Sequence, residues 1–269
     1  MSKHPSQTVR MTVPKFMAEK SNGRKLSVLT AYDFSMARLF DEAGVDCLLV
    51  GDSMGMVVQG KSSTLAVTMD QMVYHTEMVS RAATRAIVVA DMPFGSFQPS
   101  ATDAVRNAVR LIQDGGAHAV KLEGGERVIE SIRAILRADI PVMGHLGLTP
   151  QSINKLGRYH VQRGEDELLA DAKLLEETGA FAIVLESVPQ SLAEQITKSI
   201  SIPTIGIGAG PHCDGQVLVW QDAFGLTQDF QPKFVKRYCN VHELILNAAR
   251  QFCSEVQSGV FPSAEQSYN

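Results

Sequence analysis

The sequence predicts a single-domain (β/α)8 TIM barrel spanning residues 1–269. Short apolar runs, typical of strands buried on both faces, alternate with amphipathic helical patterns, as in a parallel sheet. Eight such runs follow one another without a low-complexity linker or a break in composition. A closed barrel is favoured over an open doubly wound sheet, because closure of eight parallel strands leaves no exposed edge.

The strands are expected in order along the chain, after an N-terminal extension (1–24) in which a short helix would cover the bottom of the barrel. The eighth strand is ambiguous, because Val217-Leu218-Val219-Trp220 also fits a helix. The expected strands are 26–32, 45–51, 86–91, 118–123, 140–145, 181–186, 203–208 and 217–224.

Helices are predicted between the strands from apolar periodicity, and a C-terminal extension (232–269) carries helices and a tail. The expected helices are 33–43, 68–83, 102–114, 126–138, 165–178, 190–200 and a long helix or helix pair at 232–258. The first three helices have candidate capping residues: Asp33 for the first, Thr68 or Asp70 for the second, and Thr102 for the third. Glycines such as Gly44 and Gly179 are expected to end helices in the left-handed conformation.

Composition excludes several classes of function. The net charge is −4 and the isoelectric point is near 6.0, and no stripe of Lys and Arg interleaves with aromatic residues, so nucleic acid is not an expected partner. No apolar run approaches the roughly 18 residues of a membrane span. The polar N-terminal segment, broken by Pro5 and Pro14, resembles no targeting signal, and a cytosolic protein is expected.

Four buried strands end in a carboxylate: Asp52, Asp91, Glu123 and Glu186. An ionised carboxylate in such a place costs free energy unless a cation or a hydrogen bond compensates it. The carboxyl ends of barrel strands converge on one mouth, so the three acids of strands two to four are candidate ligands of one hard divalent ion such as Mg2+. For any one acid alone, capping of the following helix is the alternative.

Three further side chains are expected at this mouth. Lys121 shares the facing direction of Glu123, and it would form a salt bridge, steady negative charge on a substrate oxygen, or form a Schiff base. Neighbouring acids disfavour the Schiff base, because they hold the amine protonated. His145, between two glycines, is either structural or part of the site. Glu186 lies across the barrel, where it would act as a base.

Two glycine patterns are set aside. Gly55-x-x-x-x-Gly60-Lys61-Ser62 matches the phosphate-binding P-loop expression, but no helix is expected to begin at Lys61. Gly206-x-Gly208-x-Gly210 lacks the dinucleotide-binding spacing, because Pro211 stands where that pattern continues. It is expected to be a flexible turn near a ligand.

The strand ends carry a series of motifs that closely resembles the ketopantoate hydroxymethyltransferase family, from about Thr12 to Tyr268. The resemblance implies a Mg2+-dependent barrel of the phosphoenolpyruvate mutase and isocitrate lyase superfamily. The motifs are Thr30-Ala31-Tyr32-Asp33, Val50-Gly51-Asp52-Ser53-Met54-Gly55, Ala90-Asp91-Met92-Pro93-Phe94, Lys121-Leu122-Glu123-Gly124-Gly125, Gly144-His145-Leu146-Gly147-Leu148-Thr149-Pro150-Gln151-Ser152 and Gly206-Ile207-Gly208-Ala209-Gly210.

The family reaction adds a hydroxymethyl group from 5,10-methylenetetrahydrofolate to 3-methyl-2-oxobutanoate, giving 2-dehydropantoate in pantothenate biosynthesis through a Mg2+-stabilised enolate. The resemblance implies Glu186 as general base. It implies a homo-oligomer, often a decamer, acting on small molecules and needing neither nucleic acid nor a membrane. The implied metal-site acids are Asp52, Asp91 and Glu123, and the implied substrate-binding residues are Asp52, Ser53, Asp91, Lys121 and His145.

Two alternatives stay open. One is a Mg2+-dependent lyase of the same superfamily that cleaves a 2-hydroxy acid, although the Lys-x-Cys-Gly-His loop usual in that class is missing from this sequence. The other is a catalytically silent barrel that serves as a scaffold, which loss of acids at the mouth would favour. All four acids are present.

Overall fold

The eight strands form one closed barrel in the computed structural model, which describes residues 10–156, 164–228 and 232–268. Each strand pairs in parallel with the next along the chain, and the last pairs with the first. This confirms the predicted (β/α)8 barrel. The strands are β1 (Leu26–Thr30), β2 (Cys47–Val50), β3 (Ile87–Asp91), β4 (Ala119–Glu123), β5 (Val142–Gly147), β6 (Ala182–Glu186), β7 (Thr204–Ile207) and β8 (Gly215–Leu218).

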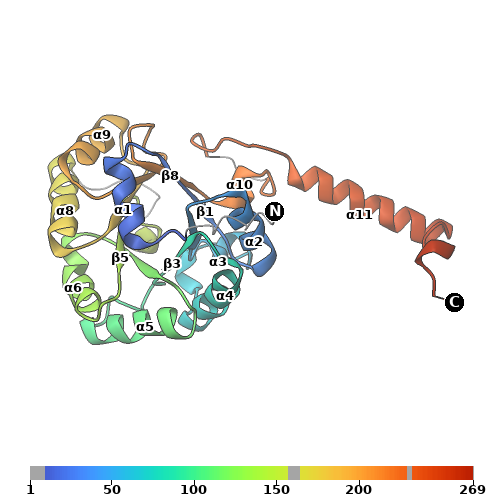
Figure 1. The fold of residues 1–269 in the computed structure, drawn as a ribbon, viewed down its shortest axis with the longest axis horizontal. Coiled ribbons are helices and arrows are strands. Elements are labelled where there is room, and N and C mark those ends of the chain that lie inside the picture. The colour runs from blue at the N-terminus through green and yellow to red at the C-terminus, as the bar shows by residue number, and fades with distance from the viewer. Residues whose placement is uncertain (1–9, 157–163, 229–231, 269) are drawn as a thin grey trace, which may run out of the picture. The chain divides into compact units, whose positions relative to one another are not determined.

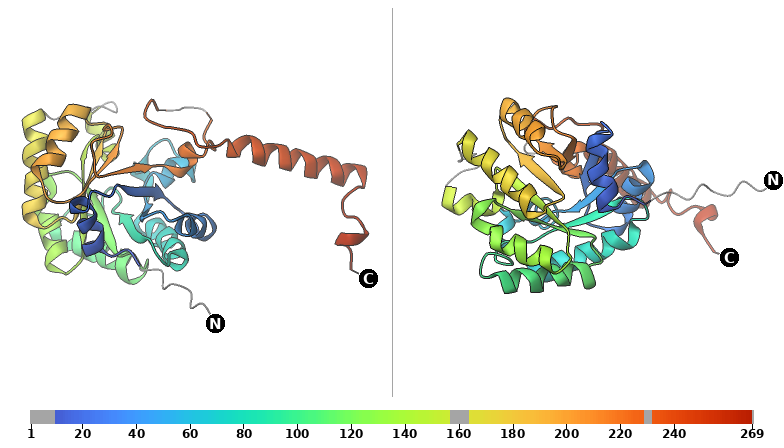
Figure 2. Two further views of the ribbon diagram at one scale, coloured as in Figure 1. Left: turned by 45° about the horizontal axis from the view of Figure 1, so that its top comes forward. Right: turned by 60° about the vertical axis from the view of Figure 1, so that its left-hand side comes forward.

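The longer helices of the barrel lie outside the strands, as Figure 1 and both views of Figure 2 show. These helices are α2 (Phe34–Ala43), α4 (Met69–Ala82), α5 (Ala101–Gln113), α6 (Ile129–Arg137), α8 (Glu165–Thr178) and α9 (Gln190–Ser199). Short helical turns occupy several loops: α3 (Met54–Val57), η1 (Thr64–Ala66), η2 (Glu126–Val128), η3 (Pro150–Ser152) and α7 (Ile153–Leu156).

Capping residues fix where the first helices begin. Asp33 accepts a hydrogen bond from the backbone N–H of Met36, as predicted, and Thr68 forms a capping box at the start of α4. The prediction that Thr102 opens the next helix is wrong, because Ser100 is the extended residue whose hydroxyl caps α5. Both side chains are good caps, and only the backbone path chooses between them.

Glycines in the left-handed region end two helices where the sequence predicts it. Gly44 follows α2 with φ of 91°, and Gly179 follows α8 with φ of 108°. A side chain with a Cβ atom adopts this conformation only at a cost, so glycine terminates the helix and turns the chain into the next strand. These turns set the position at which β2 and β6 begin.

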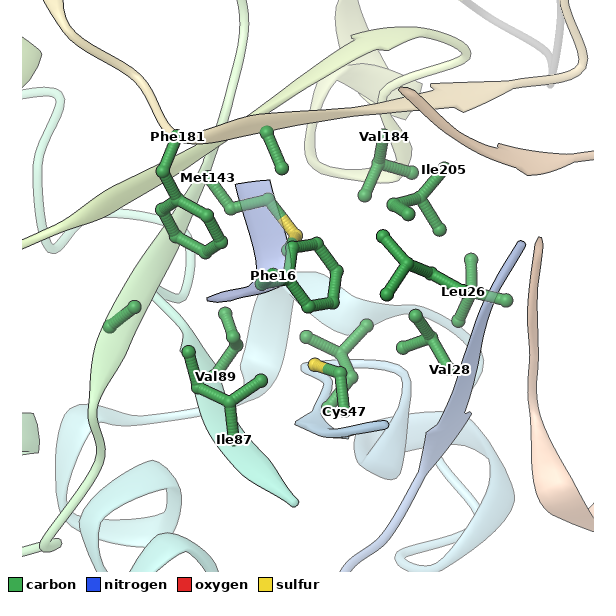
Figure 3. Packing of buried hydrophobic residues seen from close by; sticks show 14 residues of the cluster. Phe16, Leu26, Val28, Cys47, Ile87, Val89, Met143, Phe181, Val184 and Ile205 are labelled. Carbon is green, nitrogen blue, oxygen red and sulfur yellow. The ribbon is translucent and has the colours of Figure 1, made fainter. Parts of the chain in front are cut away.

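The bottom of the barrel is closed by α1 (Val13–Ser21), which confirms the short helix expected in the N-terminal extension. Phe16 is fully buried and packs edge-to-face on Phe181, with ring centroids 5.8 Å apart. Figure 3 shows the Phe16 ring among residues from the N-terminal ends of the strands, including Leu26, Cys47 and Ile87. The amino ends of the strands are therefore sealed by apolar packing. The opposite ends are left for polar side chains.

The chain divides into two compact units, residues 1–219 and 220–269. The second contains α10 (Trp220–Ala223), α11 (Val241–Ser258) and η4 (Ala264–Gln266). The predicted strand 217–224 is wrong beyond Leu218, where the chain turns into α10. The helix expected from 232 begins only at Val241, because Asn240 caps it, and Asn269 at the end of the expected extension lies outside the described part of the chain.

Candidate active site

The three acids predicted for strands two to four are all buried at the carboxyl ends of their strands. Asp91 and Glu123 are the last residues of β3 and β4, and Asp52 stands two positions after β2. The backbone N–H of Asp52 donates to Oδ2 of Asp91 over 3.1 Å. Gly51 leaves room for the Ser53 hydroxyl, since a Cβ atom there would lie 2.7 Å from Oγ of Ser53.

A row of contacts runs from β3 to β6 through the other predicted residues. Nζ of Lys121 lies 2.9 Å from Oδ1 of Asp91 and 3.2 Å from Nδ1 of His145. Because an ammonium group only donates, Nδ1 accepts and the imidazole proton sits on Nε2. That Nε2 atom lies 3.2 Å from Oε2 of Glu186. The structure thus brings Lys121, His145 and Glu186 together.

Burial and mutual repulsion disturb the protonation of this cluster. Burial, followed by the charge of Asp91, raises the pKa of Asp52 to about 7. Burial and the charge of Asp52 raise the pKa of Glu123 well above its usual range. For Lys121 burial disfavours the ammonium, but the surrounding acids, Asp91 first, outweigh it and raise its pKa to about 12. Lys121 therefore stays charged, which disfavours the Schiff-base alternative.

His145 remains a neutral imidazole near pH 7. Burial, followed by the charge of Lys121, lowers the pKa of His145. Among the residues that the structure describes, the acids of strands two to four interact with one permanent cation, Lys121, so their charges are incompletely balanced. A site of this kind attracts a further cation or holds protons.

Ser53 lies beside Asp52 and is held by a tyrosine that sequence reasoning did not single out as a site residue. The hydroxyl of Tyr32 is 2.9 Å from Oγ of Ser53, and Tyr32 is buried. Burial strongly raises the pKa of the Tyr32 hydroxyl, which keeps it neutral. Tyr32 belongs to a quoted motif, but its residue type alone did not distinguish it from a core aromatic.

Gln151 is a second residue whose part in the site the sequence did not reveal. Its side-chain amide donates to Oδ2 of Asp52 over 2.9 Å, and its backbone N–H donates to Oε2 of Glu123 over 3.0 Å. It lies in η3, about 100 residues after Asp52 in the chain. No periodicity or spacing connects the two, so only the fold shows the contact.

The donor set suits a hard divalent ion, although the carboxylates are not a complete cage. Within the ranges that the structure describes, no group of three or more His, Cys, Asp or Glu side chains is arranged to hold a metal ion. Mg2+ commonly takes only one or two direct carboxylates and keeps several waters. One oxygen of Asp52 and one of Glu123 accept from Gln151, which leaves Oδ1 of Asp52 and Oε1 of Glu123 for such an ion.

The P-loop pattern has no phosphate-binding geometry here. Lys61 directs Nζ to the carbonyl oxygen of Ala66 and to Oε1 of Gln71, and α4 begins only at Met69. A helix that starts at the Lys-Ser pair is what a P-loop requires. The mouth of the barrel is therefore the candidate site.

The described helices include none with the length and apolar character needed to cross a membrane.

The sequence matches known proteins over nearly its whole length. A family model for ketopantoate hydroxymethyltransferase matches residues 10–264. A protein of Clostridium novyi (strain NT) named 3-methyl-2-oxobutanoate hydroxymethyltransferase is 56% identical over 264 residues, which cover 97% of this chain and 96% of that protein. A protein of the same name from Trichlorobacter lovleyi is 53% identical over 263 residues, covering 97% and 99%.

Solved structures with low sequence identity share the fold. Phosphonopyruvate hydrolase in complex with oxalate and Mg++ is similar with a TM-score of 0.62 at 15% identity, covering 95% of this chain and 93% of that one. A 2,3-dimethylmalate lyase of the PEP mutase/isocitrate lyase superfamily gives 0.60 at 17% identity, covering 96% and 91%. At such identities the likeness supports the barrel architecture alone.

Proposed function

The chain belongs to the ketopantoate hydroxymethyltransferase family, and from this premise we propose that it transfers a hydroxymethyl group from 5,10-methylenetetrahydrofolate to 3-methyl-2-oxobutanoate, giving 2-dehydropantoate. It is then a one-carbon transferase of pantothenate biosynthesis. The observation that carries the proposal is the arrangement of buried acids around Lys121 at the barrel mouth, in a chain more than half identical to a protein of that name.

Mg2+ is the proposed metal, held by Asp52, Asp91 and Glu123, in part through water. The support is electrostatic. Burial and repulsion within the cluster raise the pKa values of Asp52 and Glu123, and a divalent cation would offset the repulsion that Lys121 leaves uncompensated. When bound, such an ion supplies electrophilic stabilisation of negative charge on the keto oxygen of the substrate.

Substrate binding is assigned to Asp52, Ser53, Asp91, Lys121 and His145. The Ser53 hydroxyl, held by Tyr32, would donate to the carboxylate of the oxo acid. The ammonium group of Lys121 is held by Asp91 and stays charged, so it would stabilise the oxygen on which negative charge develops. A buried ammonium acts more strongly on that oxygen than one in water would.

Glu186 is proposed as the general base that takes the proton from C3 of the oxo acid. It is the least buried of the four strand-end acids, with 19% of its side chain exposed. Nε2 of His145 lies 3.2 Å from Oε2 of Glu186 without a hydrogen bond in this structure, and a small rotation of the ring would let its N–H hold the carboxylate in one orientation. The base therefore stands on the opposite side of His145 from Lys121. The proton and the developing charge would be handled by separate groups.

The rest of the reaction balances with one water. The carbanion at C3 attacks the methylene carbon of the folate, presented as an iminium ion, and a C–C bond forms. The bond from this carbon to N5 of the folate then breaks, and N5 takes the proton that Glu186 removed from C3. Water supplies the oxygen of the hydroxymethyl group, and the proton it releases balances the one that N10 took when the methylene bridge opened to the iminium ion. Tetrahydrofolate leaves. The folate is a co-substrate.

The deciding experiment measures 2-dehydropantoate formed from 3-methyl-2-oxobutanoate and 5,10-methylenetetrahydrofolate, with and without a chelator. We expect product that depends on both substrates and is lost on chelation and restored by MgCl2. Cleavage of a 2-hydroxy acid without folate would instead indicate the lyase. No turnover with any of these substrates, despite a folded protein, would indicate a silent barrel.

We also propose, from the family resemblance, that the protein forms a homo-oligomer, with a decamer as the expected assembly. Its proposed location is the cytosol. The structure buries none of the side chains of α11, although Leu244, Ile245 and Phe252 are apolar and more than half exposed. Apolar side chains in such number are usually covered in a folded assembly. Light scattering coupled to size exclusion would give the mass. A monomer at micromolar concentration would contradict this part of the proposal.

A further inference from the structure

Gln151 connects the ends of three neighbouring strands. Its amide nitrogen Nε2 donates to Oδ2 of Asp52 and to the backbone carbonyl oxygen of Met92, both over 2.9 Å. Its backbone N–H donates to Oε2 of Glu123 over 3.0 Å. Asp52 follows β2, Met92 follows β3 and Glu123 ends β4. One buried residue from the loop after β5 thus contacts all three strand ends.

The orientation of the Gln151 amide is fixed by its other partner. Oε1 of Gln151 accepts a hydrogen bond from Nε2 of Gln98 over 3.0 Å. Gln98 is oriented in turn, because its Oε1 accepts from the backbone N–H of Gly95 over 2.7 Å. The oxygen of Gln151 must face Gln98, so its NH2 group must face Asp52. A chain of two amides therefore runs from the β3–α5 loop to the acid.

In each of the two carboxylates, these contacts use one oxygen and leave the other without a hydrogen bond from Gln151. Gln151 occupies Oδ2 of Asp52 and Oε2 of Glu123. The part of the chain that the structure describes offers no hydrogen-bond partner to Oδ1 of Asp52, and Oε1 of Glu123 lies 3.7 Å from Nδ1 of His145. Each acid therefore has one oxygen fixed and one oxygen available.

We propose that Gln151 is a positioning residue that fixes Asp52 and Glu123 so that one oxygen of each is presented to a divalent cation. The inference rests on the metal site of the proposed function. Groups that hydrogen-bond to metal ligands commonly change metal affinity by about 10- to 100-fold when they are removed. Gln151 holds two acids at once, and Gln98 sets which way its amide faces.

The test is a calorimetric titration of chelator-treated protein with Mn2+ alone, without substrate, for the wild type and Gln151→Met. Met has a similar length but donates no hydrogen bond. We expect Mn2+ to bind Gln151→Met about 10- to 100-fold more weakly. Gln98→Met, which frees the amide to turn over, should show a smaller loss in the same direction. This second variant tests the inference even if Gln151→Met fails to fold.

A matched control separates positioning from stability. Thr197 and Thr204 share a buried hydrogen bond of 2.7 Å at the amino end of β7, away from the mouth. Thr197→Val should lower the unfolding temperature and leave Mn2+ affinity unchanged. In assays, Gln151→Met should need more metal for half-maximal rate and recover most of kcat at saturating metal.

Two outcomes would overturn the inference. If wild type, Gln151→Met and Gln98→Met bind Mn2+ equally, Gln151 has only a structural role, and the proposed function stands. If the wild type itself binds neither Mn2+ nor Mg2+, the metal site of the proposed function fails, and the role of Gln151 fails with it. The two failures are distinguished by the wild-type titration.

Discussion

Nε2 of His145 lies 3.2 Å from Oε2 of Glu186, while Nδ1 of the same ring accepts from the ammonium of Lys121. The imidazole therefore carries its one proton on Nε2, close to Glu186 but without a hydrogen bond to it in this structure. A neutral ring in this place adds no full positive charge beside Glu186, which would weaken it as a base. This arrangement supports the proposal that Glu186 removes the proton while Lys121 stabilises the developing charge.

Glu186→Gln should abolish exchange of the C3 proton of 3-methyl-2-oxobutanoate with solvent, while binding of Mg2+ and of the oxo acid persists. Gln keeps the shape of the side chain but does not accept the proton at neutral pH. Exchange in D2O followed by proton NMR measures this step without folate. Glu194→Gln, on the exposed face of α9, is the control and should exchange normally. Near-normal exchange in Glu186→Gln would exclude it as the base.

Asp91→Ala should weaken binding of the oxo acid in the presence of Mg2+ by at least about tenfold. Asp91 contacts both Lys121 and the backbone N–H of Asp52, so its loss disturbs the metal site and the substrate cation together. Calorimetry with and without MgCl2 gives the metal-dependent part. Asp103→Ala, at a surface ion pair on α5, should bind normally. Equal affinity in Asp91→Ala and wild type would count against the metal site.

Lys121→Met should lower the free energy of unfolding by about 3–5 kcal/mol at pH 8 without metal, because it leaves buried carboxylates without their cation. MgCl2 should restore part of this loss if a divalent ion binds among the same acids. Urea unfolding followed by circular dichroism measures both effects. Lys198→Met, which removes an exposed pair with Glu194, should leave the unfolding midpoint unchanged. An equally stable Lys121→Met would contradict the charge balance derived for the site.

The sequence was sufficient for the barrel and for most of the mouth because both depend on local patterns. The carboxylate that ends each buried strand is local information, and parallel pairing brings those ends together, as the register of Asp91 with Lys121 illustrates. Contacts made by loops were not predictable. Gln151 lies in η3, after β5, and its contact with Asp52 follows no sequence pattern. The backbone path also decides that Ser100, and not Thr102, caps α5.

Without metal, the titration of Asp52 should lower the free energy of unfolding as pH rises from about 4 to about 7, and the fall should level off above about 7.5. The pKa of Asp52 is raised to about 7 in the folded protein, against about 3.9 in an unfolded chain, so the folded state binds more protons in that interval. One such group contributes at most about 1.4 kcal/mol per pH unit. The lowered pKa values of His118 and His145 act in the opposite direction, but only below about pH 6.5.

Urea unfolding in EDTA between pH 5 and 8 measures this dependence. Asp52→Asn should flatten the fall and be more stable than wild type at pH 8. MgCl2 should also flatten it for the wild type, since the ion binds the ionised acids and releases their protons. Parallel curves for Asp52→Asn and wild type would show that Asp52 does not titrate in this range.

Phe16→Ala should destabilise the protein by about 3–5 kcal/mol and leave kcat unchanged well below the unfolding temperature. Phe16 is fully buried against Phe181 and the amino ends of the strands, so Ala leaves a cavity at the bottom of the barrel. The reacting groups lie at the opposite strand ends. Met17→Ala, next to it on α1 but 37% exposed, is the control and should change stability little. A stable Phe16→Ala would show that α1 does not seal the barrel. A stable fold with lowered kcat would instead mean that packing at the bottom reaches the mouth through the strands.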